Sequence, residues 1–153
     1  MTAKLNLDLE HILAEEGLID RRKLEDFVFL QKRDGRKLID VLVEHNSVPD
    51  EKLAEALARK LNLPIGRWDE GKLIPLADQN LDELISYDFA QTNLVLPLAR
   101  TLDTVIIAMV DPTDFFLVDN LEKMVSSKIK VVVASRGELL IAIKEFYPNK
   151  KAR

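Results

Sequence analysis

The chain has 153 residues, of which 47% are hydrophobic and 31% charged, and its formal net charge is −4. This balance predicts a folded chain of one compact unit or two small subdomains, and it excludes a disordered segment and a general attraction for nucleic acid. The absence of cysteine excludes disulfides, thiolate nucleophiles and cysteine-based zinc sites. The beginning of the sequence does not resemble a secretory signal, and the longest apolar runs have the length of strands, so we expect no insertion into a membrane.

Residues 9–31 and 38–60 repeat one helical pattern. In the first copy, leucines recur at helical spacing until Gly17, which suits the left-handed position that ends many helices. Asp20 then caps a second, longer helix, and the chain turns at Gly35. The pattern therefore predicts a short helix, a turn and a longer helix.

The second copy predicts the same helix pair with different stop and start residues. Asn46 takes the place of Gly17, because asparagine is the next most frequent residue at a left-handed helix end. Pro49 opens the following helix, where its missing N–H has no cost. One helix pair buries too little apolar surface alone, so we expect the two pairs to pack together.

The helical pattern stops at residues 61–75, where two prolines and two glycines predict a connector. After it, apolar runs of strand length appear, and a Ser135–Glu138 capping box precedes the last helix. The predicted strands are 94–99, 104–110 and 129–134, with one helix after the second strand and another after the third.

These elements predict an α+β fold. We expect an N-terminal helical subdomain of two tandem helix-pair repeats (1–62), a connector (63–79), and a small C-terminal subdomain (80–153). In this C-terminal subdomain, we expect helices to pack on a sheet of roughly three strands.

The sequence contains no signature of catalysis. The five glycines never fall into the spacings of a phosphate-binding loop, so we expect no nucleotide-hydrolysing centre in this chain. His11 and His45 are isolated on predicted helices, and we expect no metal site. The chain is therefore not expected to be an enzyme by itself.

Two sets of charged residues suggest binding. Asp111 and Asp114 follow a predicted strand, a usual place for ligand-binding residues. They would either bind a metal, act as an acid–base pair, or form a turn and a helix cap together with Thr113. Turn and cap formation is the favoured interpretation. Four cations gather at the hinge between the helix pairs. They form either a solvated turn or an anion-binding surface: Lys32, Arg33, Arg36 and Lys37.

The tandem helical pattern, the sequence LNLP at 61–64 and the segment from 95 to 147 together resemble a known family. It is the N-terminal (MshEN-type) domain of type II secretion and type IV pilus assembly ATPases. The most specific part is VIIAMVDPTDFFLVDNL at 105–121, which resembles the family's strand, Asp-Pro and helix signature.

The resemblance implies a non-catalytic docking and regulatory domain that tethers the motor to the inner-membrane platform. The implied partners are the cytoplasmic domain of a platform protein and the C-terminal ATPase domain of the same polypeptide. The implied location is cytoplasmic, peripheral to the inner membrane through a partner, with no nucleic acid bound. We assign Lys32, Arg33 and Arg36 as candidate docking residues.

In a subset of the family the tandem repeat binds cyclic di-GMP, which gives the alternative function of a sensor domain. Each copy there begins Arg-Leu-Gly, has a glycine after the first helix and ends in glutamine. The present copies instead begin Asp8-Leu9-Glu10 and Lys37-Leu38-Ile39. The resemblance assigns the following nucleotide-binding candidates: Leu9, Leu13, Gly17, Gln31, Lys37, Leu38, Leu42 and Asn46.

The replaced residues oppose binding of an anionic ligand. One carboxylate about 4 Å from a phosphate costs on the order of 4 kcal/mol at an effective dielectric constant near 20, before salt screening. Lys37 supplies charge without the planar donor set of arginine, and Ile39 is branched where glycine allows close approach. We therefore expect no cofactor in this chain and a ligand site that is largely lost.

Overall fold

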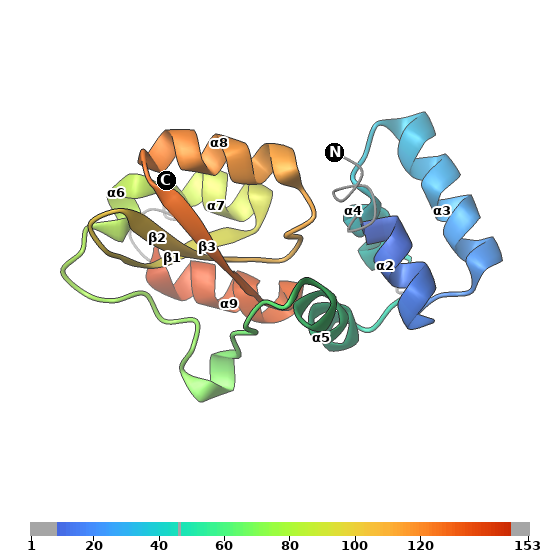
Figure 1. The fold of residues 1–153 in the computed structure, drawn as a ribbon, viewed down its shortest axis with the longest axis horizontal. Helices are drawn as coiled ribbons and strands as arrows, with labels where there is room; N and C mark the ends of the chain where they lie inside the picture. Colours follow the sequence, from blue (N-terminus) through green and yellow to red (C-terminus); the bar gives the residue numbers. More distant parts are fainter. Residues whose placement is uncertain (1–8, 46, 148–153) are drawn as a thin grey trace.

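The structure is a computed structural model and describes residues 9–45 and 47–147. In the described residues up to 61, four helices lie together on one side of the molecule (Figure 1). They alternate short and long, as the tandem pattern predicted: α2 (Leu9–Glu16), α3 (Arg21–Asp34), α4 (Leu38–Glu44) and α5 (Asp50–Leu61).

Local sequence explains where these helices begin and end. The carboxylate of Asp20 accepts a hydrogen bond from the Arg22 N–H at 2.7 Å and so caps α3. Gly17 and Gly35 have φ of 64° and 67°, the left-handed conformation in which glycine is least strained. The predicted stop at Asn46 lies outside the described residues.

The second part is a three-stranded sheet with helices on it. The strands are β1 (Val95–Arg100), β2 (Thr104–Met109) and β3 (Lys128–Val133), in the order β1-β2-β3. β1 and β2 are antiparallel, whereas β2 and β3 are parallel. The helices of this part are α6 (Leu81–Leu84), α7 (Tyr87–Asn93), α8 (Phe115–Val125) and α9 (Arg136–Phe146).

The connector carries a short 3-10 helix, η1 (Trp68–Glu70), and is tied to both outer strands. Its first part pairs with the end of β3, where the Gly66 N–H donates to the Val133 carbonyl at 2.8 Å. Farther along, the Leu76 N–H donates to the Leu98 carbonyl of β1 at 2.9 Å. The subdomain limits at residues 62 and 79 stay a prediction.

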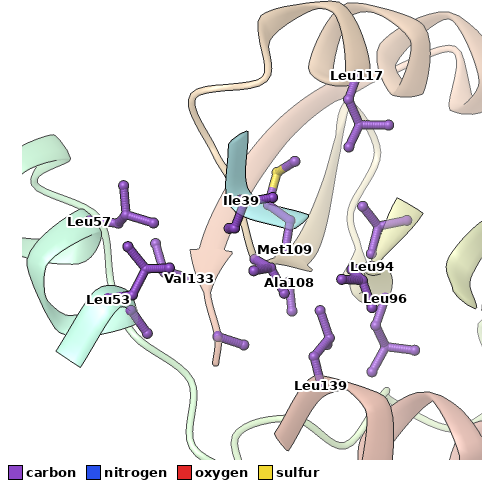
Figure 2. Packing of buried hydrophobic residues seen from close by; sticks show 14 of the residues in the cluster. Ile39, Leu53, Leu57, Leu94, Leu96, Ala108, Met109, Leu117, Val133 and Leu139 are labelled. Atoms are coloured by element: carbon purple, nitrogen blue, oxygen red, sulfur yellow. The ribbon is translucent and has the colours of Figure 1, made fainter. Parts of the chain in front are cut away.

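One hydrophobic core cluster includes residues of the helical part and of the sheet. Leu53 and Leu57 of α5 lie beside Val133 of β3, and Ile39 of α4 lies beside Met109 of β2 (Figure 2). The helix pairs therefore bury part of their apolar surface against the sheet as well as against each other. None of the helices described by the structure is long and apolar enough to cross a bilayer.

Candidate functional site

A cleft of about 580 Å³ lies between the helical part and the sheet part. α2, α3 and the start of α4 form one wall, and the turn after β2 with the first two turns of α8 forms the other. Its lining combines apolar, amide and charged side chains: Leu9, Glu10, Gln31, Lys37, Leu38, Asn93, Asp111, Thr113, Asp114, Phe116, Leu117 and Asn120.

The cleft contains four of the eight predicted nucleotide-binding residues, namely Leu9, Gln31, Lys37 and Leu38. The remaining four are not among its lining residues. Leu13 and Leu42 are 0% and 1% exposed and belong to the core, Gly17 ends α2, and Asn46 lies outside the described residues. The nucleotide-binding role of the set stays a prediction.

Lys37 is the one cation among the lining residues, and its ammonium group lies 2.9 Å from Asp114 Oδ2. The other carboxylate oxygen of Asp114 accepts the Leu117 N–H at 3.1 Å and so caps α8. Asp114 is thus the helix cap that the sequence predicted, and it also pairs with the cation of the cleft. An anionic ligand would have to compete with Asp114 for Lys37.

Asp111 forms the turn that leads into α8. Its Oδ1 accepts hydrogen bonds from the Thr113 N–H at 3.1 Å and from the Thr113 hydroxyl at 2.5 Å. Burial raises the pKa of the Asp111 carboxyl, and the two hydrogen bonds from Thr113 act in the opposite direction. The turn interpretation accounts for this residue. Within residues 9–45 and 47–147, no cluster of three or more acidic or imidazole side chains is arranged to hold a metal ion.

The charges of the cleft do not favour phosphate. Three carboxylates line it, those of Glu10, Asp111 and Asp114, against the single ammonium group of Lys37. The sequence identified Glu10 as an unfavourable replacement and Lys37 as a weak one, but gave no signal for Asn93 or Asn120. The Asp-Pro turn after a strand was the one indication that this edge of the sheet contributes to the site.

The three candidate docking residues lie at the end of α3 and in the hinge after it. Arg33 pairs with its neighbour Asp34 at 3.0 Å, and Arg36 pairs with Glu44 of α4 at 2.7 Å. The Arg36 guanidinium lowers the pKa of the Glu44 carboxyl. Lys32 is exposed, and no ion pair is found for it among the described residues. Local carboxylates therefore offset part of the positive charge predicted here.

Replacing Asp111 by asparagine tests the electrostatic description of the cleft. A carboxyl whose pKa is higher in the folded state destabilises the fold progressively as the pH rises from its unfolded pKa, about 3.9, through its folded value. Asparagine keeps the acceptor oxygen and carries no charge, so the variant should unfold at higher urea concentration than the native chain at neutral pH. The difference should disappear below about pH 3.

The matched control is Asp119→Asn, which changes an exposed carboxylate on α8. Urea denaturation of the three proteins at both pH values gives the comparison. An Asp111→Asn effect of equal size at both pH values would mean that burial of the charge is not its cause.

Comparison with known proteins agrees with this fold. The structure matches that of MshE with cdg, that is, cyclic di-GMP, at 28% identity and a TM-score of 0.66, over 91% of this chain and 98% of that one. It also matches the N-terminal domain of XpsE at a TM-score of 0.71, over 86% of this chain and 88% of that one. The two chains are 20% identical, so this match supports the fold alone.

In sequence, the chain is 28% identical over 142 residues to the type IV pilus assembly ATPase PilB of Myxococcus xanthus (strain DK1622). The match includes 93% of this chain but 24% of PilB, so the chain spans about a quarter of that relative. The α+β fold and these similarities define the class of protein, an N-terminal domain of pilus and secretion ATPases.

The family model of the MshEN domain matches residues 72–153, more than half of the chain. The chain belongs to the MshEN domain family, which confirms the resemblance seen in the sequence, and the α+β fold class is confirmed with it.

Proposed function

We propose that this domain docks and regulates the motor of a type II secretion or type IV pilus assembly ATPase by tethering it to the inner-membrane platform. The observation that carries the proposal is the ion pair between Lys37 and Asp114 in a cleft lined by two further carboxylates. A cleft with this charge disfavours a ligand with two phosphate groups, while the fold of the family is kept. Attachment is then the function that remains for the domain.

The partners under this proposal are the cytoplasmic domain of a platform protein and the ATPase domain of the same polypeptide. The domain would thus work in the cytoplasm, at the inner membrane through its partner. Lys32 and Arg33 are exposed in the last turn of α3, and Arg36 is half-buried in the hinge that follows. Three cations so close in the chain suit an acidic surface of the platform protein. Charges at the rim of an interface mainly speed association and select the partner.

Exchange of these three residues for alanine tests the proposal. We expect the dissociation constant for the platform protein's cytoplasmic domain, measured by biolayer interferometry, to rise roughly tenfold, mostly through slower association. The control is the triple alanine variant of Arg21, Arg22 and Lys23, which removes the same charge from the other end of α3. Equal loss in both triple variants would point to overall charge, and no loss in either would reject this docking surface.

A cyclic di-GMP sensor is the second candidate. It is favoured by the collection of Leu9, Gln31, Lys37 and Leu38 in one cleft and by the similarity to the structure of MshE with cyclic di-GMP. Calorimetry separates the two candidates. Under the docking proposal, micromolar cyclic di-GMP releases no heat with the native chain, whereas binding that is lost in Gln31→Ala establishes the sensor.

A further inference from the structure

The two outer edges of the sheet differ in how they are covered. The connector covers the edge of β1, because Leu76 bonds to Leu98 and the Gln79 side chain bonds to the Arg100 N–H at 2.9 Å and to the Arg100 carbonyl at 3.1 Å. At the outer edge of β3, the backbone of the described residues outside the sheet pairs only with the final residue of the strand. The Val133 N–H donates to the Pro64 carbonyl at 2.9 Å, in addition to its bond with Gly66.

The backbone of β3 alternates between its neighbour and this outer edge. The Lys128 N–H donates to Asp103 at 3.2 Å and the Ala134 N–H donates to Met109 at 3.1 Å, so the even-numbered residues face β2. Because the N–H and carbonyl groups of successive residues point to opposite sides of a strand, those of Ile129 and Val131 point away from β2.

Among the residues that the structure describes, a partner is found for one of these outward groups. The Glu122 side chain accepts the Ile129 N–H at 3.3 Å. In the part of the chain that the structure describes, no hydrogen bond is found for the Ile129 carbonyl or for the N–H and carbonyl of Val131. These groups form a short row of the kind to which an added strand bonds.

The side chains of this strand indicate what would pair with it. Lys128 and Lys130 are exposed on one face of β3, and among residues 9–45 and 47–147 neither has an ion-pair partner. A second copy of β3 would place lysines against lysines, which is unfavourable across a strand pair, whereas a strand with acidic residues would place carboxylates there. The charge therefore selects an acidic partner and opposes self-association.

We propose that the outer edge of β3 is a docking site for an extended acidic segment of a partner protein. The segment adds as a fourth strand and hydrogen-bonds to Ile129 and Val131, and Glu122 releases the Ile129 N–H as it enters. Carboxylates of the segment lie against Lys128 and Lys130. The edge shares no residue with the cleft or with Lys32, Arg33 and Arg36, so this proposal and the proposed function can fail separately.

Amide exchange of the free domain provides the first test. In two-dimensional NMR, the Val131 amide should exchange with solvent faster than the Val132 amide, because only the latter faces β2. Addition of a peptide of alternating glutamate and valine should slow the Val131 amide. An unchanged Val131 exchange rate at saturating peptide would overturn the proposal.

Fluorescence polarisation with the same labelled peptide provides the second test. The double variant Lys128→Glu/Lys130→Glu should lose binding roughly tenfold or more, whereas Lys23→Glu/Lys52→Glu, exposed cations of the helical part, should not. Val131→Pro should also lose binding, since it removes an outward N–H and leaves the bonds to β2 intact. If Val131→Pro fails to fold, the lysine variants and the amide exchange rates still test the proposal.

Two control peptides separate strand addition from simple charge attraction. A peptide with lysine in place of glutamate, and an acidic peptide with proline at every second position, should both bind at least tenfold more weakly. Equal binding of the proline-containing peptide would overturn the proposal, because it would leave charge alone as the cause. Dimers in sedimentation equilibrium that disappear in the lysine double variant would overturn it in favour of a second copy.

Discussion

Replacing Leu57 by alanine should lower the free energy of unfolding by about 2–5 kcal/mol, the cost typical of a buried leucine. Leu57 is fully buried at the junction where α5 meets β3 (Figure 2), so the cavity would open between the helical part and the sheet. The loss is large against the roughly 5–15 kcal/mol that stabilises a small domain. If one core holds both parts, the fluorescence of the single tryptophan, Trp68, and the helical circular dichroism should report the same urea transition. In the variant, the midpoint of this transition should fall by the same amount for both signals.

The matched control for this prediction is Phe29→Ala, which removes a large side chain that is 65% exposed on α3. We expect a change within about 0.5 kcal/mol, as for most surface substitutions. Separate transitions in the Leu57 variant, with Trp68 fluorescence changing at a different urea concentration from the helical signal, would contradict the continuous core and favour two independent folding units.

The sequence predicted best those helices whose ends are fixed by residues close to them in the sequence. Asp20 caps α3, Asp114 caps α8 and Ser135 caps α9, each by accepting an N–H from the first turn of its own helix. Gly35 ends α3 in the left-handed conformation for an equally local reason. Short-range chemistry of this kind can be recognised in a single sequence.

The candidate site was predictable only in part, because it depends on contacts between distant segments. The resemblance gave the order of the candidate residues along the chain but not their burial, and the structure places Leu13 and Leu42 in the core and not in the lining of the cleft. Nor does any local pattern show that Lys37 reaches Asp114, since their distance depends on how the helical part packs on the sheet. The sequence shows Asp8 and Lys37 where the family pattern has arginine, and the structure adds the carboxylates of Asp111 and Asp114 to the lining of the cleft.

Replacing Asp50 by alanine should cost about 2–4 kcal/mol, because two hydrogen bonds to a charged acceptor are lost. Asp50 is the first residue of α5, yet its carboxylate accepts the Arg136 N–H at 3.0 Å and the Gly137 N–H at 2.7 Å, at the start of α9. A carboxylate at this end of a helix also interacts favourably with the helix dipole. One side chain thus holds the second helix pair against the last helix of the sheet part, and urea denaturation would measure its contribution.

Two further variants separate this contact from the effect of Asp50 on its own helix. Glu51→Ala removes an exposed carboxylate from the same first turn of α5, and it should cost a few tenths of a kcal/mol through the dipole of α5. Asp50→Asn keeps an acceptor oxygen without the charge and should fall between the alanine variant and the native chain. Amide exchange at Arg136 and Gly137 should become faster in Asp50→Ala and stay unchanged in Glu51→Ala. Equal losses of stability in the two alanine variants, with unchanged exchange at α9, would mean that Asp50 acts on α5 alone and that the apolar core holds the two parts together without it.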